Sequence, residues 1–197
     1  MFKRIFDFIF SFLGLIVASL ILALIALLIK RDSRGPIFYR GLRSGQYGKP
    51  FRIFKFRTMV PDAEKLGGPS TSADDPRLTN FGKFLRKRKL DELPQLLNVF
   101  FGQMSVVGPR PEVPSEVETY DQKTKEIILS VKPGMTDLAS LANIHEEEIL
   151  RGSSDPHQTY REVIKPQKLK LAVEYVENRS FWFDIKIILK TLKSAFF

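Results

Sequence analysis

Residues Ile5 to Ile29 read IFDFIFSFLGLIVASLILALIALLI, a run of 25 residues in which Asp7 is the one charged side chain. As an α-helix this run would be about 37 Å long, whereas the hydrocarbon core of a bilayer is about 30 Å thick. The run is too long for the apolar region of a signal peptide, and no cleavage site of small residues follows it. It therefore predicts a helix that enters a membrane.

The charges on both sides of this run favour a hairpin over a full span. The basic residues next to it are Lys3, Arg4, Lys30, Arg31 and Arg34. Because cationic flanks prefer the cytoplasmic side, a helix that enters and leaves the same leaflet satisfies both flanks. Gly14 and Ser19 are the positions at which such a helix could bend, although neither is a strong helix breaker. We expect residues 1–34 to form a re-entrant membrane anchor and residues 35–197 to form a cytosolic catalytic domain.

The composition limits the classes of partner. The chain has 197 residues and a formal net charge of +9, which is typical of proteins that bind nucleic acid, anionic lipid or a polyanionic small substrate. The apolar run favours the last two. With no cysteine, the chain has no disulfide framework and no thiolate zinc site. His145 and His157 lie in a polar stretch without metal-ligand spacing, so we interpret both as surface residues.

The sequence after the anchor predicts a mixed α+β domain. Residues 37–59 are rich in β-formers and glycine and predict two short strands around a loop, with Phe54 and Phe56 on one face and Lys55 and Arg57 on the other. An ordinary amphipathic strand explains that pattern equally well. Residues 67–76 are turn-formers and predict a loop.

The predicted helices are mostly amphipathic. Thr79-Asn80 should cap one helix, Asp91 should cap another that continues through Phe101, and a third is expected at 115–130. The last helix should begin near Ser180. Its apolar residues lie at helical spacing, which is typical of a helix in the bilayer interface and equally of one packed on a core. We therefore expect a mostly helical domain with a small β-hairpin.

An acidic pair lies within the most basic part of the chain. Asp91 and Glu92 belong to the segment LDELPQ at 90–95. The basic residues before it are Lys83, Arg86, Lys87, Arg88 and Lys89. Adjacent carboxylates beside so much positive charge indicate a site that holds an anion and attacks it. The turn Gly108-Pro109-Arg110-Pro111 displays one guanidinium, a group suited to bidentate phosphate contact.

These motifs resemble those of the bacterial sugar transferases, a family of small monotopic phosphoglycosyl transferases. The resemblance runs nearly from end to end. Its matching segments are KRIFD at 3–7, the apolar run, FKFRTM at 54–59, LDELPQ at 90–95, LNV at 97–99, GQMSVVGPRP at 102–111, Pro133-Gly134 with Thr136, and Asn178 with Ser180, Asp184 and Lys186. The chain departs from the family at Ser19-Leu20, where Ser-Pro is usual, and through residues 137–167, so the resemblance does not name the sugar.

The resemblance implies a reaction and a set of site residues. The family transfers a sugar phosphate from a UDP-sugar to polyprenol (undecaprenyl) phosphate, which gives polyprenyl diphosphate sugar and UMP. By resemblance, Asp91 is the nucleophile of a covalent intermediate, and Glu92 binds Mg²⁺ or assists proton transfer. The implied Mg²⁺ ligands are Asp91 and Glu92, with Asp184 as a further candidate. The residues expected to bind the diphosphate are Arg86, Arg110, Lys55 and Arg57.

The resemblance also places the protein at the cytoplasmic face of a bacterial inner membrane. Inner-membrane lipid is the expected partner there, and nucleic acid is not expected. The sequence leaves open whether the protein forms a homodimer. One alternative is a non-catalytic, membrane-bound basic module that binds anionic lipid or nucleic acid, although such a module gives no reason for an acidic pair within its basic region. Another alternative is the same enzyme with direct, single-step transfer.

Overall fold

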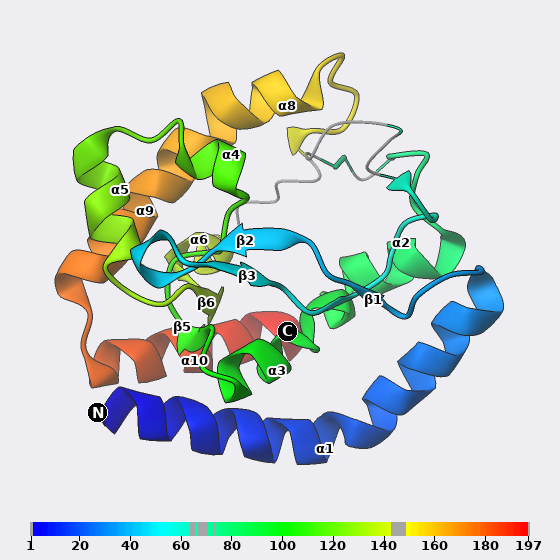
Figure 1. The fold of residues 1–197 in the computed structure, drawn as a ribbon, viewed down its shortest axis with the longest axis horizontal. Coiled ribbons are helices and arrows are strands. Elements are labelled where there is room, and N and C mark those ends of the chain that lie inside the picture. Colours follow the sequence, from blue (N-terminus) through cyan, green and yellow to red (C-terminus); the bar gives the residue numbers. More distant parts are fainter. Residues whose placement is uncertain (1, 64–65, 67–70, 73, 143–148, 197) are drawn as a thin grey trace.

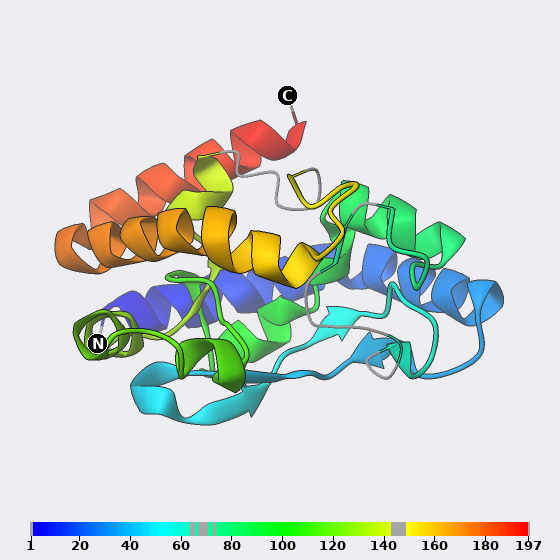
Figure 2. The same cartoon turned by 90° about the horizontal axis from the view of Figure 1, so that it is seen from above.

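The computed structural model describes residues 2–63, 66, 71–72, 74–142 and 149–196. Within these residues, helices surround three small two-stranded sheets, so the expected α+β class is confirmed (Figure 1). In Figure 2, α8 (Pro156–Thr159), α9 (Lys165–Asn178) and α10 (Phe181–Phe196) lie on one side of the molecule, and the hairpin of β2 (Leu42–Ser44) and β3 (Pro50–Arg52) lies on the other. The helices are α1 (Phe2–Asp32), α2 (Asn80–Lys87), α3 (Gln95–Phe100), α4 (Pro114–Val117), α5 (Gln122–Leu129), α6 (Leu138–Leu141), α8 (Pro156–Thr159), α9 (Lys165–Asn178) and α10 (Phe181–Phe196).

The first helix, α1, contains the whole apolar run and is long and apolar enough to cross a membrane. Its middle is exposed, with Val17 at 85% and Leu20 at 82%. Figure 1 shows that α1 bends along its length. The Ser19 hydroxyl donates to the Ile16 carbonyl at 2.7 Å, a local hydrogen bond of the kind that often bends helices.

Both ends of α1 contact the domain that follows it in the sequence. Near its start, Arg4 donates to the carbonyls of Val99 (2.6 Å) and Phe100 (2.8 Å) at the end of α3, and Asp7 accepts from the Val106 amide at 3.0 Å. Near its end, Ile25 and Ile29 pack in a buried cluster. The other buried members of this cluster are Phe56 and Leu85.

The predicted hairpin is present, in two segments. β1 (Phe38–Tyr39) pairs antiparallel with β4 (Lys55–Phe56), and β2 (Leu42–Ser44) pairs antiparallel with β3 (Pro50–Arg52). A short 3₁₀ turn at Gln46–Gly48 joins β2 to β3. Gly48 adopts φ of 72° there, a conformation that glycine accepts without strain. Phe56 is buried, but Phe54 lies just outside the strands, with the Arg40 guanidinium over its ring.

The helix before the acidic pair begins as expected, but the helix after it does not. Thr79 caps α2 by accepting from the Gly82 amide, and Leu85 is fully buried. Asp91 is not an N-cap, because it lies inside a 3₁₀ turn, η3 (Leu90–Glu92), and α3 begins only at Gln95. The reversal between α2 and η3 passes through Lys89 at φ 53°, so the acidic pair lies on a sharp turn rather than at a helix N-terminus.

The core lies where a parallel pair of strands meets the hairpin, α3, α9 and α10. β5 (Ser105–Val107) pairs with β6 (Gly134–Thr136). The buried core residues include Phe51, Ile53, Val99, Met104, Val106, Val107, Tyr175, Val176, Ile187 and Ile188. Gly108 and Gly134 are in backbone contact, since a Cβ on Gly134 would lie 2.0 Å from the Gly108 nitrogen. This close approach fixes the chain just before Arg110.

The C-terminal half differs from its sequence-based description. The single helix expected at 115–130 is divided into α4, which ends at Val117, and α5, which Asp121 caps by accepting from the Thr124 amide. The polar region after residue 137 contains α6, α8 and a π-helical turn, η4 (Tyr160–Ile164). In α10, Ile188 is buried in the core, whereas Trp182 (78%) and Leu189 (62%) are exposed. One face of α10 is therefore a core face, and its expected place in the bilayer interface stays a prediction.

Candidate active site

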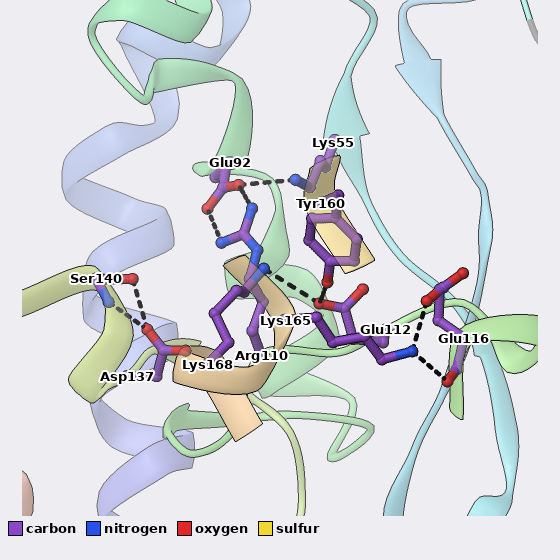
Figure 3. A network of polar contacts seen from close by, with 10 residues as sticks. All are labelled: Lys55, Glu92, Arg110, Glu112, Glu116, Asp137, Ser140, Tyr160, Lys165 and Lys168. Carbon is purple, nitrogen blue, oxygen red and sulfur yellow. Dashed lines mark hydrogen bonds and ion pairs between the residues drawn. The ribbon is translucent and has the colours of Figure 1, made fainter. Parts of the chain in front are cut away.

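Glu92 forms ion pairs with two basic side chains. Lys55, from β4, donates to Glu92 Oε1 at 2.7 Å, and Arg110 donates to Oε1 at 2.6 Å and to Oε2 at 3.5 Å (Figure 3). Burial acts to raise the pKa of this carboxyl, but Arg110 and Lys55 outweigh it and hold the pKa well below its usual value. Glu92 is therefore ionised and keeps two cations beside the turn.

Asp91 is buried beside the same cations but does not bond to them. Its exposed fraction is 7%, and its carboxylate has no hydrogen-bond or ion-pair partner within the described part of the chain. Burial raises the pKa of Asp91, and the charge of Glu92 adds to this effect. The nearby cations that lower it are Lys55, Arg86 and Arg110. At Asp91 desolvation therefore outweighs the nearby cations, whereas at Glu92 the cations outweigh desolvation.

Arg110 is held in position by the strand pair before it. The Gly108 amide donates to Thr136 O at 3.1 Å, and the Gly134 amide donates to Pro109 O at 2.9 Å. Proline on each side of Arg110 restricts the backbone further. The guanidinium consequently reaches Glu92 from a rigid turn, whereas Lys55 reaches it from the hairpin.

Arg86 also lies beside the acidic pair. It occupies the last turn of α2, and its Nε donates to the Thr58 hydroxyl at 3.2 Å. Of the four basic residues expected at the site, the structure therefore gathers Lys55, Arg86 and Arg110 around Asp91 and Glu92.

Arg57 is placed elsewhere. Its guanidinium donates to the carbonyls of Arg34 (2.8 Å) and Ser33 (2.8 Å) and to the Ser33 hydroxyl (2.9 Å). Arg57 is thus buried against the two residues that follow α1, whose carbonyls it satisfies. The structure gives Arg57 contacts just after α1, and the expected contact with phosphate stays a prediction.

Asp184 is likewise separated from the acidic pair. It forms an ion pair with Lys3 and accepts from the Tyr175 hydroxyl at 2.8 Å. Within the described residues, no three or more Asp, Glu, His or Cys side chains lie together as a metal site. Asp184 therefore fastens the start of α1 to α9 and α10, and the structure does not assemble it with Asp91 and Glu92.

Three residues that sequence reasoning missed continue the charge network. Glu112, two residues after Arg110, accepts from the Tyr160 hydroxyl at 2.8 Å and from Lys168 Nζ at 3.2 Å (Figure 3). Glu112 follows the Gly-Pro-Arg-Pro turn directly and could have been noticed from its position. Tyr160 and Lys168 lie about 50 residues further along, and no local pattern marked them.

Comparison with known proteins gives the site its context. The sequence matches the family described as bacterial sugar transferase over residues 1–197. The chain belongs to this family. Among its curated relatives is the UDP-glucose:undecaprenyl-phosphate glucose-1-phosphate transferase of Klebsiella pneumoniae, 41% identical over 197 residues, which covers 99% of this chain and 40% of the relative.

Other relatives of this sugar transferase are closer to it in length. A protein of the same name from Caulobacter vibrioides is 35% identical over 194 residues, which are 98% of this chain and 68% of that protein. The exopolysaccharide production protein ExoY of Sinorhizobium fredii is 36% identical over 208 residues, which are 98% of this chain and 84% of that protein. The chain spans about two fifths of the length of the Klebsiella pneumoniae relative and of the Escherichia coli protein of the same name.

Proposed function

We propose that this protein is a phosphoglycosyl transferase that moves a sugar 1-phosphate from a UDP-sugar to polyprenol phosphate. The observation that carries the proposal is the carboxylate of Asp91, which is buried, has no partner in the described part of the chain, and is bordered by Lys55, Arg86 and Arg110. Relatives at 35–41% identity bear the names of UDP-glucose:undecaprenyl-phosphate glucose-1-phosphate transferases, which supports the same reaction class.

The chemistry divides into two displacements at one phosphorus atom. An Asp91 oxygen attacks the sugar-bearing phosphorus, the bridging P–O bond breaks, and UMP leaves with the bridging oxygen and its electron pair. A phosphate oxygen of polyprenol phosphate then attacks the same phosphorus, and Asp91 leaves as a carboxylate. A carboxylate nucleophile thus splits a difficult transfer into two easier steps. Arg110, Lys55 and Arg86 supply the positive charge that stabilises the phosphoryl oxygens.

Mg²⁺ fits the donor set of this site. The ion binds proteins through one or two carboxylates together with substrate phosphates, and the partner-free carboxylate of Asp91 lies next to that of Glu92. When bound, Mg²⁺ would neutralise negative charge on the diphosphate. Glu92 already holds Lys55 and Arg110, so we assign it first to the positioning of these cations.

A test of the proposed function is UMP release. The full chain in detergent or nanodiscs is incubated with Mg²⁺, undecaprenyl phosphate and each of a panel of UDP-sugars. At least one UDP-sugar should give UMP and an undecaprenyl diphosphate sugar in equal amounts. Absence of UMP with the whole panel, together with binding to anionic vesicles or nucleic acid, would favour the alternative of a basic module without catalysis.

The pH dependence should report the ionisation of Asp91. The attacking form is the carboxylate, and burial raises the pKa of this group above its ordinary value of 3.8. kcat/KM should therefore fall as the pH drops through a pKa above that value. Arg86→Met removes a cation that lowers this pKa, so the acidic limb should move to higher pH. An acidic limb that keeps its position in the variant would show that Asp91 is not the group that titrates.

The anchor should be re-entrant, at the cytoplasmic face of the inner membrane. A helix of 31 residues is about 46 Å long and could span a bilayer. However, Arg4 and Asp7 near its start and Ile29 near its end contact one and the same body. A perpendicular span would place these two ends on opposite sides of the membrane. The bend in α1 and its exposed apolar middle are consistent with a helix that dips into one leaflet (Figure 1).

Cysteine labelling can test this topology, because the chain has no native cysteine. Phe2→Cys and Arg34→Cys place single thiols at exposed positions before and after the apolar run. In intact cells, a membrane-impermeant maleimide should leave both thiols unlabelled, and in inverted vesicles it should label both. Labelling of the two thiols from opposite sides would contradict the re-entrant anchor and indicate a full span.

A further inference from the structure

A second carboxylate lies close to Arg110 but is held by other cations. Glu112 is separated from Arg110 only by Pro111, and its side chain is 22% exposed. Its Oε1 accepts from both the Tyr160 hydroxyl and Lys168 Nζ. Figure 3 shows Arg110 directed to Glu92 while Lys168 is directed to Glu112. Two acid–base pairs therefore lie side by side, joined by the turn at residues 108–112.

The segment that carries Tyr160 and Lys168 has an unusual backbone. Tyr160 begins the π-helical turn η4, a rare geometry that often marks functional sites, and α9 follows it directly. Lys168 Nζ lies 5.0 Å from the centre of the Tyr160 ring, and the Lys168 side chain is only 11% exposed. Lys165, in the same segment, forms an ion pair with Glu116 at 2.7 Å. The segment is thus fastened to the chain that follows Arg110.

The Glu112 carboxylate interacts electrostatically with the Arg110 guanidinium. Burial acts to raise the pKa of Glu112, but Lys168, the hydrogen bond from Tyr160, and Arg110 together lower it below its usual value. Arg110 consequently has two carboxylates within electrostatic reach, and it is bonded to Glu92 at 2.6 Å. A carboxylate that is largely shielded from water is costly without a cation, so Glu112 without Lys168 would compete for the guanidinium of Arg110.

We propose that Lys168 is a positioning residue, which neutralises Glu112 so that the Arg110 guanidinium stays beside Glu92 and Asp91. The effect of Lys168 on turnover rests on the proposed function, in which the correctly placed Arg110 binds the diphosphate of a nucleotide sugar. Lys168 needs no contact with substrate in this role. It acts from α9 through Glu112, and so a residue just after the segment 137–167, where the sequence departs from its family, is connected to Arg110.

The kinetic test uses the full chain and five variants, one of which is Glu112→Gln alone. Lys168→Met should raise the KM for the UDP-sugar and lower kcat/KM about tenfold, because Arg110 is drawn away from the diphosphate. Glu112→Gln in the same chain removes the competing charge and should restore kcat/KM to within about threefold of wild type. Lys168→Arg keeps the charge and should stay close to wild type. Lys170→Met, an equal change of charge at an exposed position of α9, is the matched control.

A purely structural role for Lys168 predicts a different pattern. In that case the losses in the Lys168→Met and Glu112→Gln variants would add in the double variant, and the absence of rescue would overturn the proposal. Thermal melting of each variant shows whether it folds. Should Lys168→Met fail to fold, Lys168→Gln makes the same comparison with a neutral polar side chain.

A structural measurement separates this inference from the proposed function. A crystal structure of the Lys168→Met variant should show the Arg110 guanidinium bonded to Glu112 instead of Glu92. An Arg110 that still bonds Glu92 alone would overturn the inference, whatever the rate of turnover. If the wild-type chain released no UMP, the proposed function would fail, yet the partner of Arg110 in this variant would still decide the inference.

Discussion

Asp91→Asn is expected to lower turnover by about 10³-fold or more, the largest effect of any single substitution in this protein. The amide is nearly isosteric with the carboxylate, so the buried turn should keep its shape. It is not a nucleophile, however, and cannot form an acyl phosphate. Because Asp91 has no bond to its neighbours in the described part of the chain, the substitution removes no structural hydrogen bond. The loss should therefore be a loss of kcat in a folded protein.

The matched control for this experiment is Asp121→Asn. Asp121 is exposed and caps α5, and asparagine caps helices as well as aspartate does. This variant should retain wild-type turnover and melting temperature. Residual turnover of the Asp91→Asn variant above about a tenth of wild type would show that Asp91 does not attack the substrate.

Arg110→Lys is expected to lower kcat/KM about 10²-fold. Arg110 contacts both oxygens of Glu92, which shows that its fork can reach two acceptors at once. Lysine keeps the charge but presents a single point donor, and it cannot copy a bidentate contact to phosphate. Initial rates of UMP release against the concentration of the UDP-sugar measure this effect.

Arg179→Lys serves as the control for the change of side chain alone, since Arg179 is exposed between α9 and α10. It should be indistinguishable from wild type. If Arg110→Lys also kept near-normal kcat/KM, Arg110 would be an ordinary solvated cation. The contacts with the substrate phosphates would then have to be assigned to Lys55 and Arg86.

The parts of the fold that follow from local pattern could be predicted from the sequence. The apolar run, the glycine loop of the hairpin and the Thr79 cap each carry their signal within a few residues. The N-cap expected at Asp91 was wrong, because a left-handed Lys89 inserts a 3₁₀ turn before α3. The helix expected at 115–130 was divided for a similarly local reason, namely the competing cap at Asp121.

The site was only partly predictable, because charge reveals the type of a group and not its partner. Arg57 and Asp184 have the charges expected at a phosphate or metal site, yet the structure pairs them with the two ends of α1. Lys168 reaches Glu112 across 56 residues of sequence, a contact that only the folded chain creates. Asp91 and Glu92 are adjacent and alike in sequence, and burial and partners alone separate their pKa values.

The most direct test of the covalent mechanism is the intact mass of the protein after incubation with a UDP-sugar and Mg²⁺ but no lipid acceptor. The mass should increase by one phosphosugar group, about one equivalent of UMP should be released, and Asp91→Asn should show neither. Polyprenol phosphate added afterwards should remove the adduct, and initial rates should follow ping-pong kinetics. Full turnover with acceptor, but no adduct and intersecting ternary-complex plots, would contradict a nucleophilic Asp91 and favour direct transfer.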